Sequence, residues 1–229
     1  MPWRPDSIRM TSTNTKEARR TVDAPLPIGV LLSGNGSNLQ AIIDAVEAGR
    51  IDGQIVLVLS NASKAFALER ARKHGIPARF ISKKQAGSDE AFNDQILAAL
   101  REAGAELVVL AGYLPIVGGQ VVRAYPHRII NIHPALIPAF CGVGMYGHHV
   151  HEAVLEYGAK LSGATTHFVD EQVDHGGVIL QKSVPVLEGD TPDTLAARVL
   201  EVEHEILPES VRLFCAGKLG VDGRHVHVL

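Results

Sequence analysis

The stretch IGVLLSGNGSNL, residues 28–39, decides the fold of this 229-residue chain. Its first five residues form a continuous apolar run, which is typical of a strand buried on both faces of a parallel sheet. Gly34 and Gly36 then break the chain, and Ser37 and Asn38 are residue types that favour a helix N-terminus. The segment therefore predicts the first strand-turn-helix unit of an α/β fold.

Strands and helices continue to alternate after this unit. Further buried strands are predicted at residues 55–59, 80–81, 107–110 and 128–132, with amphipathic helices between the earlier ones. This alternation predicts a doubly wound, mostly parallel sheet of the Rossmann-like kind. Residues 164–169 and 178–186 look like strands of a more mixed C-terminal part of the sheet. A long helix from Pro192 and a hairpin turning at Asp222-Gly223 complete the prediction.

Composition limits the classes of protein that the chain can represent. The formal net charge is -3 and 46% of the residues are hydrophobic, so a nucleic-acid-binding surface is not favoured. No apolar run is long enough to span a membrane, and the two cysteines show no metal-site spacing, so we expect a cytoplasmic protein. Residues 1–24 read as a disordered leader, and residues 25–229 as a single domain.

The turn after the first strand is suited to bind a phosphate. Glycines let the backbone approach a ligand, and a helix N-terminus offers unpaired N–H groups and a positive dipole end. The dinucleotide fingerprint requires a third glycine where Leu39 stands and an acid where Asn61 stands, and the lysine of a nucleoside-triphosphate loop is absent. The turn therefore favours a phosphomonoester, with a well-capped structural turn as the alternative.

A second polar cluster, Asn131-Ile132-His133-Pro134, ends an apolar strand. Residues two apart on a strand share a face, so Asn131 and His133 are expected to project together. The carboxyl end of a strand is where open α/β sheets bind ligands. An amide beside an imidazole suits chemistry at a carbonyl. The alternative is a buried strand-end histidine that bonds only to backbone.

A third cluster holds Asp174 in a polar loop between two predicted strands, just before Gly176 and Gly177. A carboxylate placed against an imidazole raises the imidazole pKa. If Asp174 lies beside His133, we expect the protonated ring to be available at pH 7. The alternative is an aspartate that caps a turn.

These three clusters, in this order, resemble the folate-dependent formyltransferase superfamily, and in particular its branch that acts on glycinamide ribonucleotide. The resemblance covers residues 28–217. It implies transfer of a formyl group from 10-formyltetrahydrofolate to the amine of glycinamide ribonucleotide, a step of purine synthesis. The alternatives are a hydrolase that releases formate from the folate, and a non-catalytic nucleotide-binding module. The resemblance leaves a monomer and a homodimer open, and implies neither a metal nor a membrane or nucleic-acid partner.

The resemblance also assigns roles to residues. The catalytic positions are Asn131, His133 and Asp174. The positions that match ribonucleotide contacts are Gly36, Ser37, Asn38 and Glu203. The positions that match the folate-binding segment are Leu114, Pro115, Ile116 and Val117, together with Asn131. Thr165 and His167 match residues that line the same cleft.

Two features of the chain stand apart from the family pattern. Pro115 and Asp89 occupy places where arginines are often found, so the resemblance leaves the contacts to the folate tail open. The histidines at positions 148, 149 and 151 resemble a metal patch, but no carboxylate completes a recognised motif. We expect His149 and His151 to line or gate the cleft instead, after a loop that its glycines at 142, 144 and 147 make flexible.

Overall fold

The computed structural model describes residues 24–229, and the leader expected at residues 1–24 lies outside the described residues except for its last one. The strands are β1 (Leu26–Leu32), β2 (Gly53–Ser60), β3 (Ala78–Phe80), β4 (Leu107–Leu110), β5 (Ile129–His133), β6 (Leu161–Phe168), β7 (Val178–Pro185), β8 (Leu219–Asp222) and β9 (His225–Val228). The helices are α1 (Ser37–Glu47), α2 (Phe66–Lys73), α3 (Lys83–Ala86), α4 (Asp89–Glu102), α5 (Gly119–Ala124), α6 (His148–Tyr157) and α7 (Pro192–Cys215).

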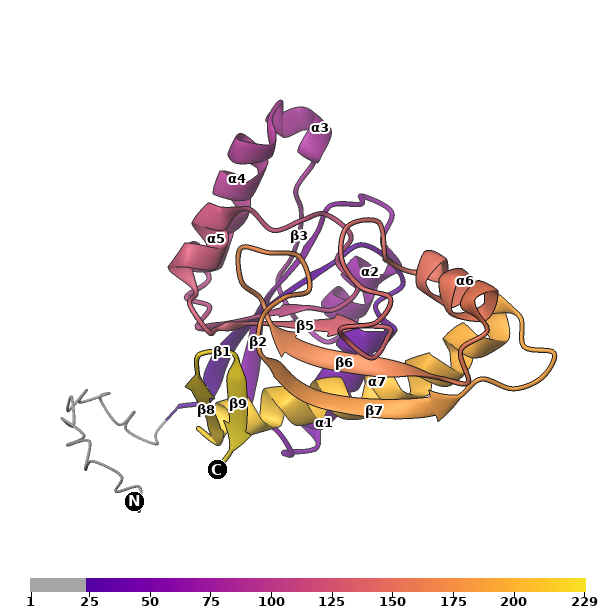
Figure 1. Cartoon of the computed structure of the whole chain (residues 1–229). Coiled ribbons are helices and arrows are strands. Elements are labelled where there is room, and N and C mark those ends of the chain that lie inside the picture. Colours follow the sequence, from indigo (N-terminus) through magenta and orange to yellow (C-terminus); the bar gives the residue numbers. More distant parts are fainter. Residues whose placement is uncertain (1–23) are drawn as a thin grey trace, which may run out of the picture.

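The main sheet has the order β3-β2-β1-β4-β5-β6-β7 (Figure 1). The first five strands in this order pair in parallel, whereas β6 runs antiparallel to both β5 and β7. This arrangement confirms the predicted mostly parallel sheet with a mixed C-terminal part. The predicted terminal hairpin is also present, because β8 pairs antiparallel with β9 in a small second sheet.

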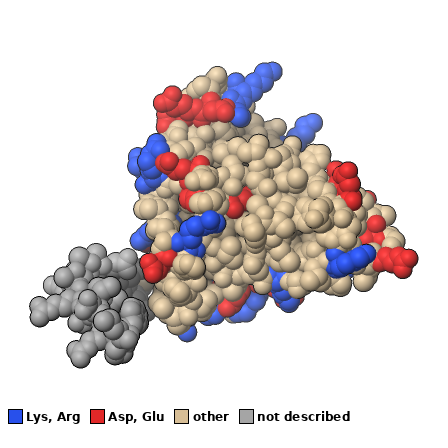
Figure 2. Space-filling view, in the orientation of Figure 1, with Lys and Arg blue, Asp and Glu red and all other residues tan. Residues whose placement is uncertain are grey.

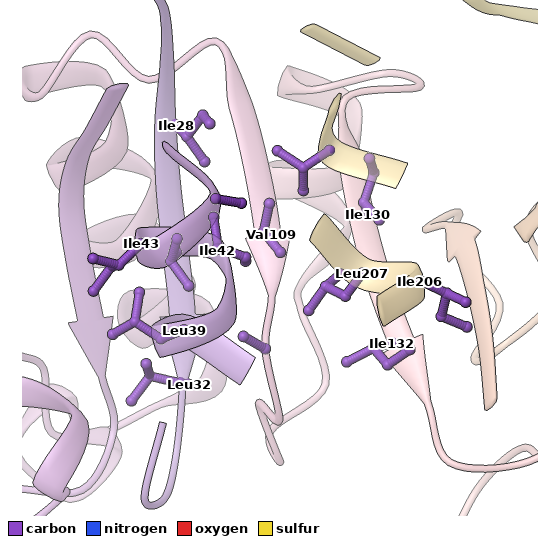
Figure 3. Close-up of a cluster of buried hydrophobic side chains, with 14 of the residues drawn as sticks. Ile28, Leu32, Leu39, Ile42, Ile43, Val109, Ile130, Ile132, Ile206 and Leu207 are labelled. Carbon is purple, nitrogen blue, oxygen red and sulfur yellow. The ribbon is translucent and has the colours of Figure 1, made fainter. Parts of the chain in front are cut away.

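Helices cover both faces of the sheet, as a doubly wound fold requires. On one face, side chains of α1 and α7 such as Leu39, Ile42 and Leu207 pack against the strands (Figure 3). On the other face, α4 and α5 supply a second cluster that includes Phe92 and Val121. Each fully buried side chain of this size contributes about 1.5–3 kcal/mol to stability. Together the two clusters hold the strand ends in fixed positions.

The strand order places three loops at one edge of the sheet. After β1 the chain moves outward to β2 and β3, and it then returns to form β4 and β5 on the other side of β1. The reversal lies between β1 and β4, and ligands of open α/β sheets bind beyond the carboxyl ends of the strands at such a point. The turn after β1 and the loop after β4 carry the predicted phosphate and folate residues, Asn131 and His133 end β5, and Asp174 lies in the loop between β6 and β7.

Within residues 24–229, no helix combines the length and apolarity needed to cross a lipid bilayer. Among the described residues on the face shown in Figure 2, acidic and basic side chains are interspersed around a broad uncharged area, and neither sign forms a large continuous patch.

Candidate functional site

The glycine-rich turn ends at a helix N-terminus whose N–H groups are not capped by a side chain. The N-cap is Gly36, which has φ 80°, and Ser37 and Asn38 are the first helical residues rather than the cap predicted from their type. A Cβ on Gly36 would lie 2.5 Å from the Cβ of Ala67, so both the backbone angle and the space require glycine. The turn thus presents backbone donors and a positive dipole end to an anion.

A second helix braces this turn. Arg70 of α2 donates to the backbone oxygen of Asn35 at 3.0 Å and to its Oδ1 at 2.8 Å. Both acceptors belong to the residue just before Gly36, so the turn is held in shape by contacts within the protein.

Asn38 connects the turn to the last helix. Its Nδ2 donates to Oε2 of Glu203 at 2.7 Å, and both side chains are buried. Burial raises the pKa of Glu203, although the hydrogen bond from Asn38 opposes this shift. Among the described residues, Oδ1 of Asn38 is buried without a hydrogen-bond partner. Buried polar groups are normally paired, so the unpaired Oδ1 of Asn38 is an exception within this contact.

Ser33 links the turn to the predicted folate segment. Its Oγ donates to Oδ1 of Asn61 at 2.6 Å and accepts from the backbone N–H of Leu114 at 2.9 Å. One hydroxyl therefore joins the loops that follow β1, β2 and β4.

A cavity of about 820 Å³ lies beside these loops. It is lined by most of the residues that the sequence assigns to the site, namely Leu114, Pro115, Ile116, Val117, Asn131, His133, His151, His167, Asp174 and Glu203. Leu114 and Ile116 are 56% and 65% exposed, so the cavity wall after β4 is apolar and open. Gly36, Ser37 and Asn38 do not line the cavity themselves, and they reach it through the contact of Asn38 with Glu203.

The three predicted catalytic residues meet in this cavity. Nδ1 of His133 lies 3.6 Å from Oδ2 of Asp174, and Nε2 of His167 lies 3.6 Å from Oδ1 of the same carboxylate. Asn131 pairs with His167 in the register of β5 and β6, and its Nδ2 lies 3.0 Å from Nε2 of His167. The sequence predicted His167 only as a cleft-lining residue, whereas the structure places it in contact with two of the three.

Backbone groups of the loop after β5 orient both partners of the His133–Asp174 pair. Nε2 of His133 lies 2.8 Å from the carbonyl oxygen of Phe140, so this nitrogen carries a proton. The N–H of Gly142 donates to Oδ2 of Asp174 at 2.9 Å. In the neutral ring, Nδ1 is therefore unprotonated and faces the carboxylate. A proton that His133 gains must go to Nδ1, directly beside Asp174.

The expectation that Asp174 would keep His133 protonated at pH 7 is wrong for the protein without substrates. Burial lowers the pKa of His133 below its usual value, and this effect outweighs the attraction of Asp174 and the hydrogen bond to Phe140. Burial would raise the pKa of Asp174, but contacts with His167, Gly142 and His133 outweigh it and lower that pKa. The pair therefore rests as a neutral imidazole beside a carboxylate.

Two predicted cleft-lining residues lie outside the cavity. His149 is exposed and contacts Glu152, because the face of α6 that meets the cavity carries His148 and His151, three positions apart. Thr165 is fully buried, and its Oγ1 donates to the carbonyl of Ala135 at 2.6 Å. Its hydroxyl ties down the loop after β5 and does not face a ligand.

His151 is a buried histidine of the cavity wall. It is 4% exposed, and its Nδ1 has no hydrogen-bond partner among the described residues. Burial, together with His148 and His133, lowers the pKa of His151 to about 4. Within residues 24–229, no three His, Cys, Asp or Glu side chains are grouped so that they could hold a metal ion.

The depressed pKa of His151 predicts a loss of stability in acid. Below about pH 6.5 the unfolded chain protonates this ring, whereas the folded protein does so only near pH 4, so the free energy of unfolding falls as the pH drops through this window. We expect His151→Leu to reduce that slope by at most about 1.4 kcal/mol per pH unit. Urea unfolding at pH 4.5–7 measures it, with His149→Leu as the exposed control. Equal slopes in all three proteins would contradict the buried, neutral state of His151.

The fold is that of the formyl transferase family, and the comparisons agree. The model of the formyl transferase family matches residues 27–211, and the chain belongs to this family. It is 42% identical over 192 residues to the phosphoribosylglycinamide formyltransferase of Escherichia coli K12. These residues are 84% of this chain and 88% of that protein. It is similar to the crystal structure of glycinamide ribonucleotide transformylase 1 from Symbiobacterium toebii, with 45% identity, a TM-score of 0.86, and coverage of 90% of this chain and 94% of that one.

A plant relative is longer than this chain. The chloroplastic phosphoribosylglycinamide formyltransferase of Arabidopsis thaliana is 42% identical over 193 residues, which are 84% of this chain but 66% of that protein. The comparisons confirm the family and the fold that the sequence motifs predict. The roles of individual residues rest on the geometry described above.

Proposed function

We propose that the protein transfers the formyl group of 10-formyltetrahydrofolate to the amine of glycinamide ribonucleotide. The observation that carries the proposal is one cavity that joins an apolar wall and a polar catalytic cluster and is connected to a helix N-terminus. The uncapped N-terminus of α1 reaches it through Asn38 and Glu203 and suits a phosphorylated sugar. The apolar segment around Leu114 and Ile116 suits a flat pterin ring. Asn131, His133 and Asp174 stand between them and suit a carbonyl under attack.

Asn131 and His133 stabilise the charge that develops during transfer. When the amine attacks the formyl carbon, the carbonyl oxygen gains negative charge. The amide of Asn131 has one N–H engaged near His167 and a second N–H available for this oxygen. A protonated His133 adds a positive charge in a buried place, where such a charge has a strong effect.

Asp174 makes protonation of His133 possible. The amine loses a proton as its bond to the formyl carbon forms, and the proton ends on the folate N10 as the bond from N10 to that carbon breaks. Nδ1 of neutral His133 can hold this proton transiently, because the carboxylate of Asp174 lies 3.6 Å away and favours the charged ring. The low resting pKa of His133 thus leaves Nδ1 free to accept it.

We assign the phosphate of the ribonucleotide to Gly36, Ser37 and Asn38, and its sugar to Glu203. We further propose that residues 25–229 act as one formyltransferase domain, and that they do so in the cytoplasm. The segment from Leu114 to Val117 binds the pterin. His151 contacts the part of the ribonucleotide that lies near His133.

An absorbance assay of folate deformylation tests the function. The protein is mixed with 10-formyltetrahydrofolate, with and without glycinamide ribonucleotide. We expect turnover only when the ribonucleotide is present, together with formylated product. Turnover without ribonucleotide would select a hydrolase instead, and binding without turnover would select a non-catalytic nucleotide-binding module.

Loss of Glu203 should weaken ribonucleotide binding specifically. We expect Glu203→Ala to raise the KM for the ribonucleotide about 10- to 100-fold, because a hydrogen bond to a charged group is worth about 1.5–3 kcal/mol. The KM for the folate should not change, since Glu203 lies on the side of Asn38. Glu205→Ala, which removes an exposed carboxylate of the same helix, is the control. A raised folate KM with an unchanged ribonucleotide KM would contradict the assignment.

A further inference from the structure

The β8–β9 hairpin lies against the base of the loop that carries Asp174 (Figure 1). This loop, residues 169–177, joins β6 to β7. Nη2 of Arg224, in the turn of the hairpin, donates to the carbonyl oxygen of His175 at 2.8 Å. The hairpin follows the segment that matches the formyl transferase family, which ends at residue 211.

Packing at this contact is close enough to require glycine. A Cβ added to Gly177 would lie 2.8 Å from Cγ2 of Val226 and 2.9 Å from the carbonyl oxygen of Arg224. Such distances are shorter than real Cβ contacts, so the loop and the hairpin touch through backbone. The hairpin therefore contacts the loop through close packing as well as through one hydrogen bond.

The loop holds Asp174 in a conformation that needs support. Asp174 has φ 54°, in the left-handed region that residues other than glycine adopt at a cost. On one side its carboxylate accepts from the N–H of Gly142. On the other side the next residue, His175, is held by Arg224 and by a 2.8 Å contact between its Nδ1 and Oδ2 of Asp170. Asp174 is thus held by Gly142, and the residue that follows it is held by Arg224 and Asp170.

The loop also separates two cavities. A second cavity of about 250 Å³ lies between the loop and the hairpin, and Val221 and Arg224 are among its lining residues. Residues 169, 170 and 171 line both this cavity and the large one. A displacement of the hairpin would therefore be transmitted to the wall that faces the substrates.

We propose that the hairpin is a positioning element for the catalytic carboxylate. Arg224 holds the carbonyl of His175, and Val226 packs on Gly177, so that Asp174 keeps its place between His133 and His167. Arg224 and Val226 act through the loop and do not touch the substrates. The inference rests on the proposed function for its kinetic readout, while its structural readout stands apart from catalysis.

The test compares the wild type with Arg224→Ala, Arg224→Lys and Lys218→Ala in the full-length protein. Lys218→Ala removes a cation from the residue just before β8 without removing the bond to His175. For Arg224→Ala we expect kcat to fall roughly tenfold with both KM values unchanged, because small misplacements of a catalytic group cost one to two orders of magnitude in rate. Arg224→Lys keeps a donor for the carbonyl and should recover most of the loss.

Hydrogen exchange supplies the second readout. Amides of residues 170–177 should exchange faster in Arg224→Ala than in wild type, while those of α1 and α4 stay the same. If Arg224→Ala does not fold, Val226→Ala provides a milder change at the same contact. Unchanged exchange and unchanged kcat in Arg224→Ala would overturn the proposal, and so would an equal loss in Lys218→Ala. If wild type shows no ribonucleotide-dependent turnover, the proposed function fails, and the exchange data alone decide whether the hairpin fixes the loop.

Discussion

His133→Ala is expected to lower kcat by about 100- to 1,000-fold while the protein stays folded, which is the usual cost of losing one group that stabilises an oxyanion. The ring is 3% exposed, and among residues 24–229 its polar contacts are with Phe140 and Asp174. Its removal takes away both the positive charge and the temporary site for the proton of the amine. Steady-state kinetics with both substrates saturating measures the effect.

The control for this variant is His149→Ala. His149 is exposed and lies outside the cavity, so its loss should leave kcat and both KM values close to those of wild type. Far-ultraviolet circular dichroism and a melting curve establish that each variant is folded. A folded His133→Ala variant with near-normal turnover would remove His133 from the mechanism.

Asp174→Asn is expected to lower kcat by about 100-fold or more without unfolding the protein. Asparagine tolerates the left-handed backbone angle of this position, and its Oδ1 can still accept from Gly142. What the variant loses is the negative charge. Because Asp174 is the strongest influence that raises the pKa of His133, its neutralisation lowers that pKa further and makes the protonated ring less accessible.

Titration of His133 by NMR tests this reasoning separately from rate. The His133 signal should titrate at a lower pH in Asp174→Asn than in wild type. Asp44→Asn, which neutralises an exposed carboxylate on α1, should change neither the titration nor kcat. A large loss of kcat with no shift of the His133 pKa would mean that Asp174 acts on the substrates directly.

The sequence predicted those features that depend on local pattern. The strand at residues 107–110 has the predicted bounds, because its four apolar residues are followed by a change of composition. The sequence predicted that Asn131 and His133 share one face of β5, because side chains two residues apart on a strand point the same way. The strand-to-helix turn at residues 33–36 followed from its glycines, although the cap proved to be Gly36, whose left-handed φ no serine would adopt easily.

Features that depend on tertiary contacts could not be predicted in the same way. The short helix α3 has no buried residue, and α5 is only six residues long, so neither shows a helical repeat. The direction of the His133 pKa shift depends on burial by distant segments, which outweighs the neighbouring carboxylate. The side of α6 that meets the cavity depends on the residue at which the helix begins. Because α6 begins at His148, this side carries His148 and not His149.

The loop after β5 contacts His133 and Asp174 through its main chain, with the carbonyl of Phe140 and the N–H of Gly142 as the two contacts. Such contacts place few demands on the side chain of Cys141 between them. They do demand a set number of peptide units from His133 to Gly142. Exchange of Cys141 for another amino acid should therefore be tolerated, whereas a single codon inserted or deleted in this segment would separate the histidine from the aspartate.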